Sequence, residues 1–355
     1  MLAACNESDV ETALEQTGAD GATDGTGSQD DEAHKEHSAT CQTLTVASLN
    51  PVERAATLGG AVAGAPLRLV GGLAAPTRGD MARNVRRAIG IREEPRPIAT
   101  DPDDAYLPPG GMARLVHADL PTMLIAGVSA LLLQTLHPLA MAGVAEHSGY
   151  REDPLGRLRR TATFVGTTTF GTIAQAEAAI AQVHRVHRRV KGTAPDGRRY
   201  SAADPELVTF IHVAEVSSFL ASSRRYGPRP LGPEQCDRYY DEVAPVALAL
   251  GATWAPRSAA EVESYLLRVR PELYAGPQAR EARDWLLRGV ARRPGERAVY
   301  SLVLAAAIGI LPGWARRELG LSLAGPLDLL VDTAAVAPLT RGLSTAVRWM
   351  VSPPA

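Results

Sequence analysis

Apolar side chains recur along most of the chain at steps of three or four residues, the spacing of helices that bury one face. This spacing predicts helices over residues 113–144 (with a break near 137–138), 154–166, 172–191, 204–223, 233–250, 258–270, 277–292, 298–310 and 326–350. No alternating apolar and polar run is long enough to predict a sheet. We therefore expect an all-α fold with a single large helical domain.

Several predicted helices have recognisable start signals. Asp153-Pro154 and Asp204-Pro205 each place a capping side chain before a proline that suits the first helical turn. Thr172 followed by Gln175 has the spacing of a capping box. The run Thr167–Gly171 is expected to break the chain between two of these helices.

Composition divides the chain into three parts. Residues 1–50 contain ten acidic side chains and one basic one, with few large apolar groups, and predict a disordered acidic tail. Residues 51–105 form a Gly- and Pro-rich lead-in, and residues 106–350 form the helical domain. Removing the tail from the totals leaves 36 basic and 29 acidic residues in 51–355, a balance of +7 that is too diffuse to indicate nucleic acid binding.

The cysteines and the apolar runs limit the cellular context. The three cysteines form no C-x-x-C pair and no C-x-x-C-H signature, so neither a disulfide framework nor covalent haem is indicated. The longest apolar runs, 123–136 and 300–311, fall short of the roughly 18 residues of a transmembrane span. We expect a cytoplasmic protein without a transmembrane span; membrane association and export are the alternatives.

Two histidines in the predicted helix 172–191 differ in their helical phase. The apolar positions of this helix are Ile173, Ala176, Ile180, Val183 and Val190. His187 completes that series, whereas His184 lies on its flank. His187 is therefore expected to point into the core, either as a metal ligand or as a hydrogen-bonded core histidine.

Other candidate side chains carry two interpretations each. His212 and Glu215 share a helix face and could form a pair beside a cofactor or a structural hydrogen bond. Arg157 and Thr161 also share a face, which suits an anion, although a solvated surface explains the arginine equally well. His137 and His147 are interpreted as capping or loop contacts.

Motifs of several enzyme classes are missing. The sequence has no G-x-S-x-G nucleophile elbow and no H-E-x-x-H zinc signature. A di-iron bundle requires two E-x-x-H pairs, and none occurs. These absences argue against a non-haem di-iron oxygenase.

A set of spaced motifs over residues 106–320 resembles the oxygenase family that contains latex clearing protein, a rubber oxygenase, and the mycophenolic-acid-pathway oxygenase. The motifs are VHAD at 116–119, ALLLQTLHP at 130–138, HSGY at 147–150, DPxGRLxxT at 153–161, FGT at 170–172, HxxVxG at 187–192, GxxYxAxDP at 197–205, FIH at 210–212 and LPGWAR at 311–316. The resemblance implies a globin-like helical core that carries non-covalent haem b.

The resemblance also implies roles for particular residues. His187 corresponds to the histidine that holds the iron, and Arg157 and Thr161 correspond to the R-x-x-x-T motif near it. The rubber branch has a lysine before that threonine, able to cap the iron, whereas this chain has Arg160, which cannot donate a lone pair. We add Glu146 as a candidate acid or base, and His212 as a further cofactor contact.

We therefore expect a haem-dependent oxygenase, an oxidoreductase that uses O₂ on a hydrophobic, alkene- or terpenoid-like substrate with an unidentified electron donor. Its cofactor would be haem b, with neutral imidazole on one side of the iron and O₂ on the other. The alternatives are a haem-binding sensor or carrier without turnover, and a helical protein that binds no haem. The departure at Arg160 argues against rubber as the substrate.

Overall fold

A computed structural model describes residues 98–148, 154–289, 294–322 and 332–351 of the chain. The structure is 72% helical and contains twelve α-helices and two short strands within these ranges, which confirms the all-α prediction. The acidic tail (1–50) and residues 51–97 of the lead-in lie outside the described residues. A globin-like arrangement of the helices remains a prediction.

The first half of the domain consists of α4 (Met112–His117), α5 (Leu120–Gln134), α6 (Pro138–His147), α7 (Pro154–Phe170), α8 (Ile173–Arg189), β1 (Lys191–Thr193), β2 (Arg199–Ser201) and α9 (Pro205–Tyr226). The second half consists of α10 (Pro233–Ala249), α11 (Ala259–Val269), the 3₁₀-helix η3 (Arg270–Glu272), α12 (Pro277–Arg288), α13 (Pro294–Ile310), α14 (Gly313–Glu318), the π-helix η4 (Asp332–Val336) and α16 (Ala337–Val351).

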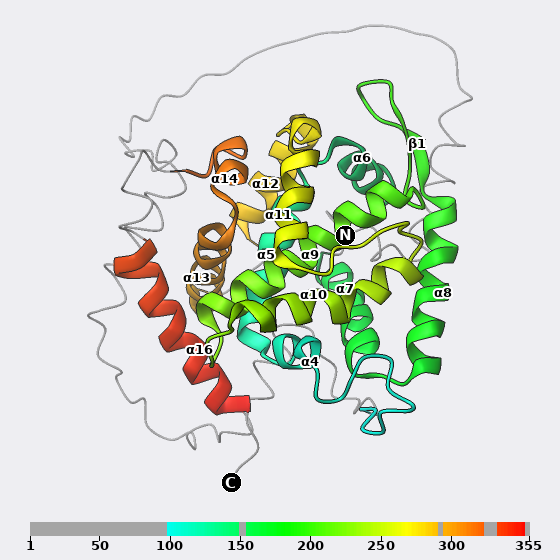
Figure 1. The fold of residues 1–355 in the computed structure, drawn as a ribbon. Coiled ribbons are helices and arrows are strands. Elements are labelled where there is room, and N and C mark those ends of the chain that lie inside the picture. Colours follow the sequence, from blue (N-terminus) through cyan, green and yellow to red (C-terminus); the bar gives the residue numbers. More distant parts are fainter. Residues whose placement is uncertain (1–97, 149–153, 290–293, 323–331, 352–355) are drawn as a thin grey trace, which may run out of the picture.

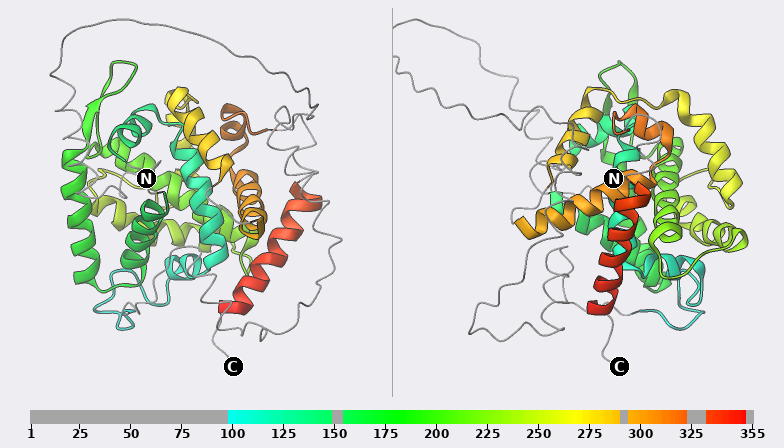
Figure 2. Two further views of the ribbon diagram at one scale, coloured as in Figure 1. Left: turned by 180° about the vertical axis from the view of Figure 1, so that it is seen from behind. Right: turned by 90° about the vertical axis from the view of Figure 1, so that its left-hand side faces the viewer.

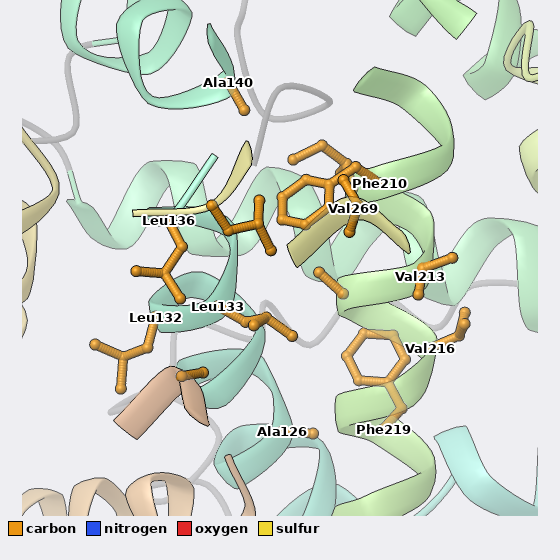
Figure 3. Packing of buried hydrophobic residues seen from close by; sticks show 14 of the residues in the cluster. Ala126, Leu132, Leu133, Leu136, Ala140, Phe210, Val213, Val216, Phe219 and Val269 are labelled. Carbon is orange, nitrogen blue, oxygen red and sulfur yellow. The ribbon is translucent and has the colours of Figure 1, made fainter. Parts of the chain in front are cut away.

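The core is built on the packing of α5 against α9. Figure 3 shows Leu133 of α5 and Leu136, just after that helix, in one cluster with Phe210 and Phe219 of α9. All four side chains are buried, and burying apolar area of this kind is the main source of folding free energy. Both helices bury many apolar residues, and for this reason they could be predicted from the sequence.

The other helices surround this pair. α8 and α16 lie on opposite flanks of the molecule, as the two opposed views show (Figures 1 and 2). The guanidinium of Arg348 ties α16 to the domain, since it donates to the Asp119 carboxylate at 2.6 and 2.8 Å and to the Tyr226 carbonyl at 2.6 Å. The antiparallel hairpin β1–β2 follows α8 directly and packs against α6.

Helix boundaries differ from the predicted ones at several helix ends and inside the run 113–144. The run 113–144 is divided three ways, because Asp119 caps a new helix by accepting from the Thr122 amide (3.3 Å), in addition to the predicted break before Pro138. The predicted break at 167–171 begins later than expected, since α7 continues to Phe170 and the break falls at Gly171 and Thr172. Within this extension the hydroxyl of Thr168 donates to the Phe164 carbonyl at 3.0 Å, so the buried side chain has its hydrogen bond inside the helix.

Two short strands and one short α-helix were not predicted. The strands β1 and β2 have three residues each, too few for an alternating pattern to show in the sequence. α14, six residues long, also falls between predicted helices. The capping box at Thr172 is confirmed: its hydroxyl accepts from the Gln175 amide (3.2 Å), and its own amide donates to Gln175 Oε1 (3.0 Å).

Candidate active site

The inward face of α8 carries His187, whose exposed fraction is 4%. Ala176, Ile180 and Val183 share this buried face, as the helical phase predicted. Ile173 does not share it: it is 38% exposed at the first helical position, so that part of the predicted stripe is wrong. The first turn of α8 projects beyond the core that the later turns cover.

His184 lies on the flank of α8 and is half-buried. Its Nε2 donates to the carbonyl of Ala249, at the end of α10, over 2.7 Å. This contact fixes the ring against the neighbouring helix, so the two histidines of α8 have different surroundings.

The hairpin after α8 brings Glu146 of α6 close to the end of that helix. Tyr200 pairs with Gly192 across the strands, and its hydroxyl donates to the Glu146 carboxylate. Gly192 has no room for a side chain, because a Cβ there would lie 2.6 Å from Tyr200 Oη and 2.8 Å from Glu146 Oε2. Glu146 is half-exposed (50%), so its carboxylate faces both the hairpin and solvent.

Burial raises the pKa of the Tyr200 hydroxyl well above its ordinary value, and the hydrogen bond to Glu146 raises it further. Tyr200 therefore remains a hydrogen-bond donor at neutral pH. Its proton holds the Glu146 carboxylate in place beside the last turn of α6.

His147, in that last turn, is 7% exposed. Neither of its ring nitrogens has a hydrogen-bond partner among the described residues, and its Nε2 lies 4.0 Å from Glu146 Oε2. Its ring is edge-on to Tyr200 with 6.1 Å between centroids. A buried imidazole that makes no hydrogen bond is unusual and calls for a partner.

The interpretation of His147 as a capping or loop contact did not foresee this burial. A signal for it exists in the sequence: His147 follows Ala140 and Val144 at helical spacing, and both of these residues are buried. The same reasoning that placed His187 in the core would have placed His147 there.

Arg157 and Thr161 lie on α7, which packs against α8 through Phe164, Ile180 and Val183. Thr161 is half-buried. The side chain of Arg157 lies outside the described part of the chain, as does that of Arg159. The R-x-x-x-T motif therefore lies on α7, which packs directly against α8, the helix that carries His187.

His212 is buried on α9, and its Nε2 has no hydrogen-bond partner within the described ranges. The structure places it near His117, whose Nδ1 and Nε2 are hydrogen-bonded to Thr169 Oγ1 (2.8 Å) and Tyr239 Oη (2.9 Å). Burial lowers the pKa of His212 to about 4, and it lowers that of His117 to about 3 with a further contribution from His212. Glu215 accepts a hydrogen bond from Gln134 Nε2 at 3.4 Å.

An open hollow lies between α6, the hairpin tip and the segment that leads into α12. Its lining is mostly apolar and consists of Thr135, Pro138, Met141, Ala194, Pro195, Asp196, Tyr274, Gly276, Pro277, Gln278 and Ala279. The hollow offers a small apolar molecule a place on the side of α6 that faces α12.

The arrangement of the histidines bears on what they could hold. No three His, Cys, Asp or Glu side chains of the described residues come together as a metal-ion site would require. A haem needs a single protein ligand on an apolar surface, and the buried stripe of α8 with His187 meets that requirement. His147 adds a second buried imidazole, near the end of α8.

The length and apolar character of the described helices bear on whether any of them could cross a membrane. No single helix among the described residues is long and apolar enough, and one bent pair, α5 with α6 at 106°, passes the test of length and composition. Leu132 and Met141 of this pair are buried in the core.

Comparison with known proteins assigns the family. Residues 114–349 match the family described as "ER-bound oxygenase mpaB/B'/Rubber oxygenase, catalytic domain". No curated protein and no solved structure matches the chain. The match spans α4 to α16 and includes every candidate residue described above. The chain therefore belongs to the family of mpaB-type and rubber oxygenases, and it is an oxidoreductase of the oxygenase class.

Proposed function

We propose that the protein is a haem b-dependent oxygenase in which His187 ligates the iron and O₂ reacts with a hydrophobic, alkene- or terpenoid-like substrate. The observation that carries the proposal is the burial of His187 on the inward face of α8, within the region matched by an oxygenase family. When bound, haem supplies an iron atom at which O₂ can be activated. We place this chemistry in one helical domain formed by residues 106–350.

His187 stands in a series of buried apolar residues at helical spacing. Val183 lies one turn before it and Val190 three residues after it, and both are buried. A ring fixed between packed apolar side chains keeps one direction, which a ligand to a flat cofactor requires. His184 is bound to α10 and therefore serves to position the helix.

Arg157 and Thr161 are proposed to bind the cofactor's propionates. A guanidinium forms strong, paired hydrogen bonds with a carboxylate, and the threonine hydroxyl adds a donor one turn away. His212 is proposed as a further cofactor contact from α9, since its Nε2 makes no hydrogen bond in the described part of the structure.

Glu146 is proposed as the acid or base. Its carboxylate is half-exposed, accepts a hydrogen bond from the Tyr200 hydroxyl and lies 4.0 Å from His147 Nε2. A proton taken from the substrate can be held at a Glu146 carboxylate oxygen while Tyr200 keeps the group in position. Because solvent reaches Glu146, the proton can then leave the site.

The absorption spectrum of the purified protein, followed by O₂ consumption with a reductant and candidate alkenes, tests the proposal. We expect a Soret band that shifts on reduction, and O₂ uptake that depends on the alkene. A Soret band without alkene-dependent uptake would indicate a haem sensor or carrier. A protein that contains no haem and takes none up would refute the proposal.

A further inference from the structure

The last turn of α6 places a buried imidazole beside a carboxylate that reaches solvent. The side chain of His147 is 8% exposed and that of Glu146 is 50% exposed, and His147 Nε2 lies 4.0 Å from Glu146 Oε2. The hydroxyl of Tyr200 donates a hydrogen bond to the same carboxylate, and its ring is edge-on to that of His147. The three side chains therefore form one connected group, with Glu146 at the surface and His147 in the interior.

Glu146 is held in this position from the side of the hairpin. Burial raises the pKa of the Tyr200 hydroxyl above its ordinary value, so Tyr200 keeps its proton and remains a donor at neutral pH. Gly192, opposite Tyr200 in the hairpin, leaves room for the carboxylate, since a Cβ there would lie 2.8 Å from Glu146 Oε2. A carboxylate has several lone pairs, so Glu146 can accept from a second donor besides Tyr200.

The two ring nitrogens of His147 have different surroundings. Both are buried, and neither has a hydrogen-bond partner among the described residues. A neutral imidazole carries a proton on one nitrogen and a lone pair on the other. We place the proton on Nε2, the nitrogen nearer the carboxylate, where a shift of about 1 Å or one bridging water would complete the hydrogen bond to Glu146. Nδ1 then has the free lone pair, which is the arrangement of a base oriented by a carboxylate.

This group lies where α6 meets the end of α8. The hairpin follows α8 directly and packs against α6 (Figure 1), and Val144, Val190 and Tyr200 belong to one buried cluster. Gly192, which contacts Glu146, comes five residues after His187 in the chain. Glu146 is open to solvent, so it cannot by itself keep water from a reacting molecule. The buried ring of His147 can take up a proton inside the protein while the site stays closed to water.

We propose that His147 is the base on the open side of the haem and that it passes protons to Glu146. The inference rests on the proposed function, to which it adds the group between the bound molecule and Glu146. The proton leaves the molecule for the lone pair of His147 Nδ1, and the electron pair of the broken bond stays on the molecule. The Nε2 proton moves to a Glu146 oxygen and from there to solvent, which leaves the ring neutral.

Cyanide binding to the ferric haem of the full-length protein tests this role without a substrate. Hydrogen cyanide keeps its proton in neutral solution but binds iron as the anion, so a base on the open side speeds its association. Carbon monoxide has no proton to lose, and its binding to the ferrous haem reports only how easily a small molecule reaches the iron. Stopped-flow changes in the Soret band measure both association rates.

His147→Gln removes the basic nitrogen and keeps a polar side chain, and His147→Phe serves as a second variant if the first does not fold. We expect cyanide association to slow about 100-fold in either variant and by a smaller factor in Glu146→Gln, while carbon monoxide binding stays within about twofold of the wild type. The control is His137→Leu, which removes a buried imidazole just before the other end of α6. Its two association rates should equal those of the wild type.

An unchanged cyanide rate in the His147 variants, or an equal loss in His137→Leu, would overturn the proposal. Equal slowing of cyanide and carbon monoxide would show that His147 shapes the path to the iron and is not a base. Faster cyanide binding would show that His147 itself occupies the open position, which also contradicts the proposal. A protein without a Soret band would refute the proposed function, whereas an unchanged cyanide rate in a haem-containing protein would refute only the role of His147.

Discussion

Two buried histidines in different regions of the core, His117 and His147, differ in their hydrogen bonding. Where α4 meets α7 and α10, both ring nitrogens of His117 are hydrogen-bonded, to Thr169 and Tyr239. At the other region, where α6 meets the hairpin, His147 is buried and makes no hydrogen bond with any described residue. A polar group that is satisfied within the protein stabilises the fold, while one left open is available to a ligand.

This contrast in hydrogen bonding distinguishes the two regions, which the family match does not do, because residues 114–349 include both of them. The open region also contains the Glu146–Tyr200 pair, and the helix that carries His187 ends there. We therefore propose that the hydrogen bonds of His117 to Thr169 and Tyr239 serve stability, and that the α6–α8 end, together with the open Nε2 of His212, serves cofactor and substrate.

The largest effect on stability is expected from His117→Phe. The change leaves the buried hydroxyls of Thr169 and Tyr239 without their partner, and each unsatisfied group costs about 1–3 kcal/mol. We expect the free energy of unfolding to fall by about 2–4 kcal/mol, measured by urea denaturation. The matched variant His147→Phe should change it by less than about 1 kcal/mol, as no hydrogen bond is lost. Equal losses in the two variants would remove the distinction between the regions.

Acid should destabilise the protein through its buried histidines. Burial lowers the pKa of His137 and of His212 to about 4, and that of His117 to about 3. In the unfolded chain these groups bind protons below about pH 6.5, so unfolding takes up protons and stability is lost as the pH falls from about 6.5 toward 4. Each proton contributes about 1.4 kcal/mol per pH unit. Urea unfolding at pH 7, 6 and 5 measures the slope, which should be smaller in His117→Phe; a flat profile would contradict it.

Arg157→Ala should reduce haem occupancy severalfold, because a propionate would lose its partner. Arg159→Ala is the matched control, since Arg159 lies about 200° around the same helix. Haem content per protein, from the pyridine haemochromogen spectrum, measures both. Similar losses of haem in the two variants would indicate that Arg157 is a solvated surface residue and not a propionate ligand.

Deletion of residues 1–48 should have the smallest effect. The tail contains few apolar groups, so we expect it to add little to the core. Unfolding free energy and haem content should equal those of the full chain. A large fall in the unfolding free energy or in the haem content would show that the tail is part of the folded domain.

Much of the fold could be predicted from the sequence because its helices are long and strongly patterned. The capping box at Thr172 and the start of α9 at Pro205 were visible as local signals. The hairpin was not, because three-residue strands depend on tertiary contacts, here Tyr200 with Glu146. The extension of α7 through the threonine run was not predicted because β-branched residues favour helices weakly, and buried Thr168 and Thr169 belong to contacts that the sequence does not show.

The candidate site was partly predictable for the same reasons. Periodicity placed His187 in the core and His184 on the flank, as observed. Periodicity could not show that Tyr200 would bind Glu146, or that His212 would lie near His117, because these contacts join segments far apart in the chain. The proposed roles of these residues depend on the proposed haem, which one measurement tests directly.

That measurement is the Soret absorption of His187→Ala and of His184→Ala, each purified beside the wild type. We predict that His187→Ala loses the band, or binds haem only loosely, and that added imidazole restores it by filling the empty position. His184→Ala should keep most of the band, since its ring is hydrogen-bonded to Ala249 and lies off the buried face. Loss of haem in His184→Ala with retention in His187→Ala would contradict the assignment of the iron ligand.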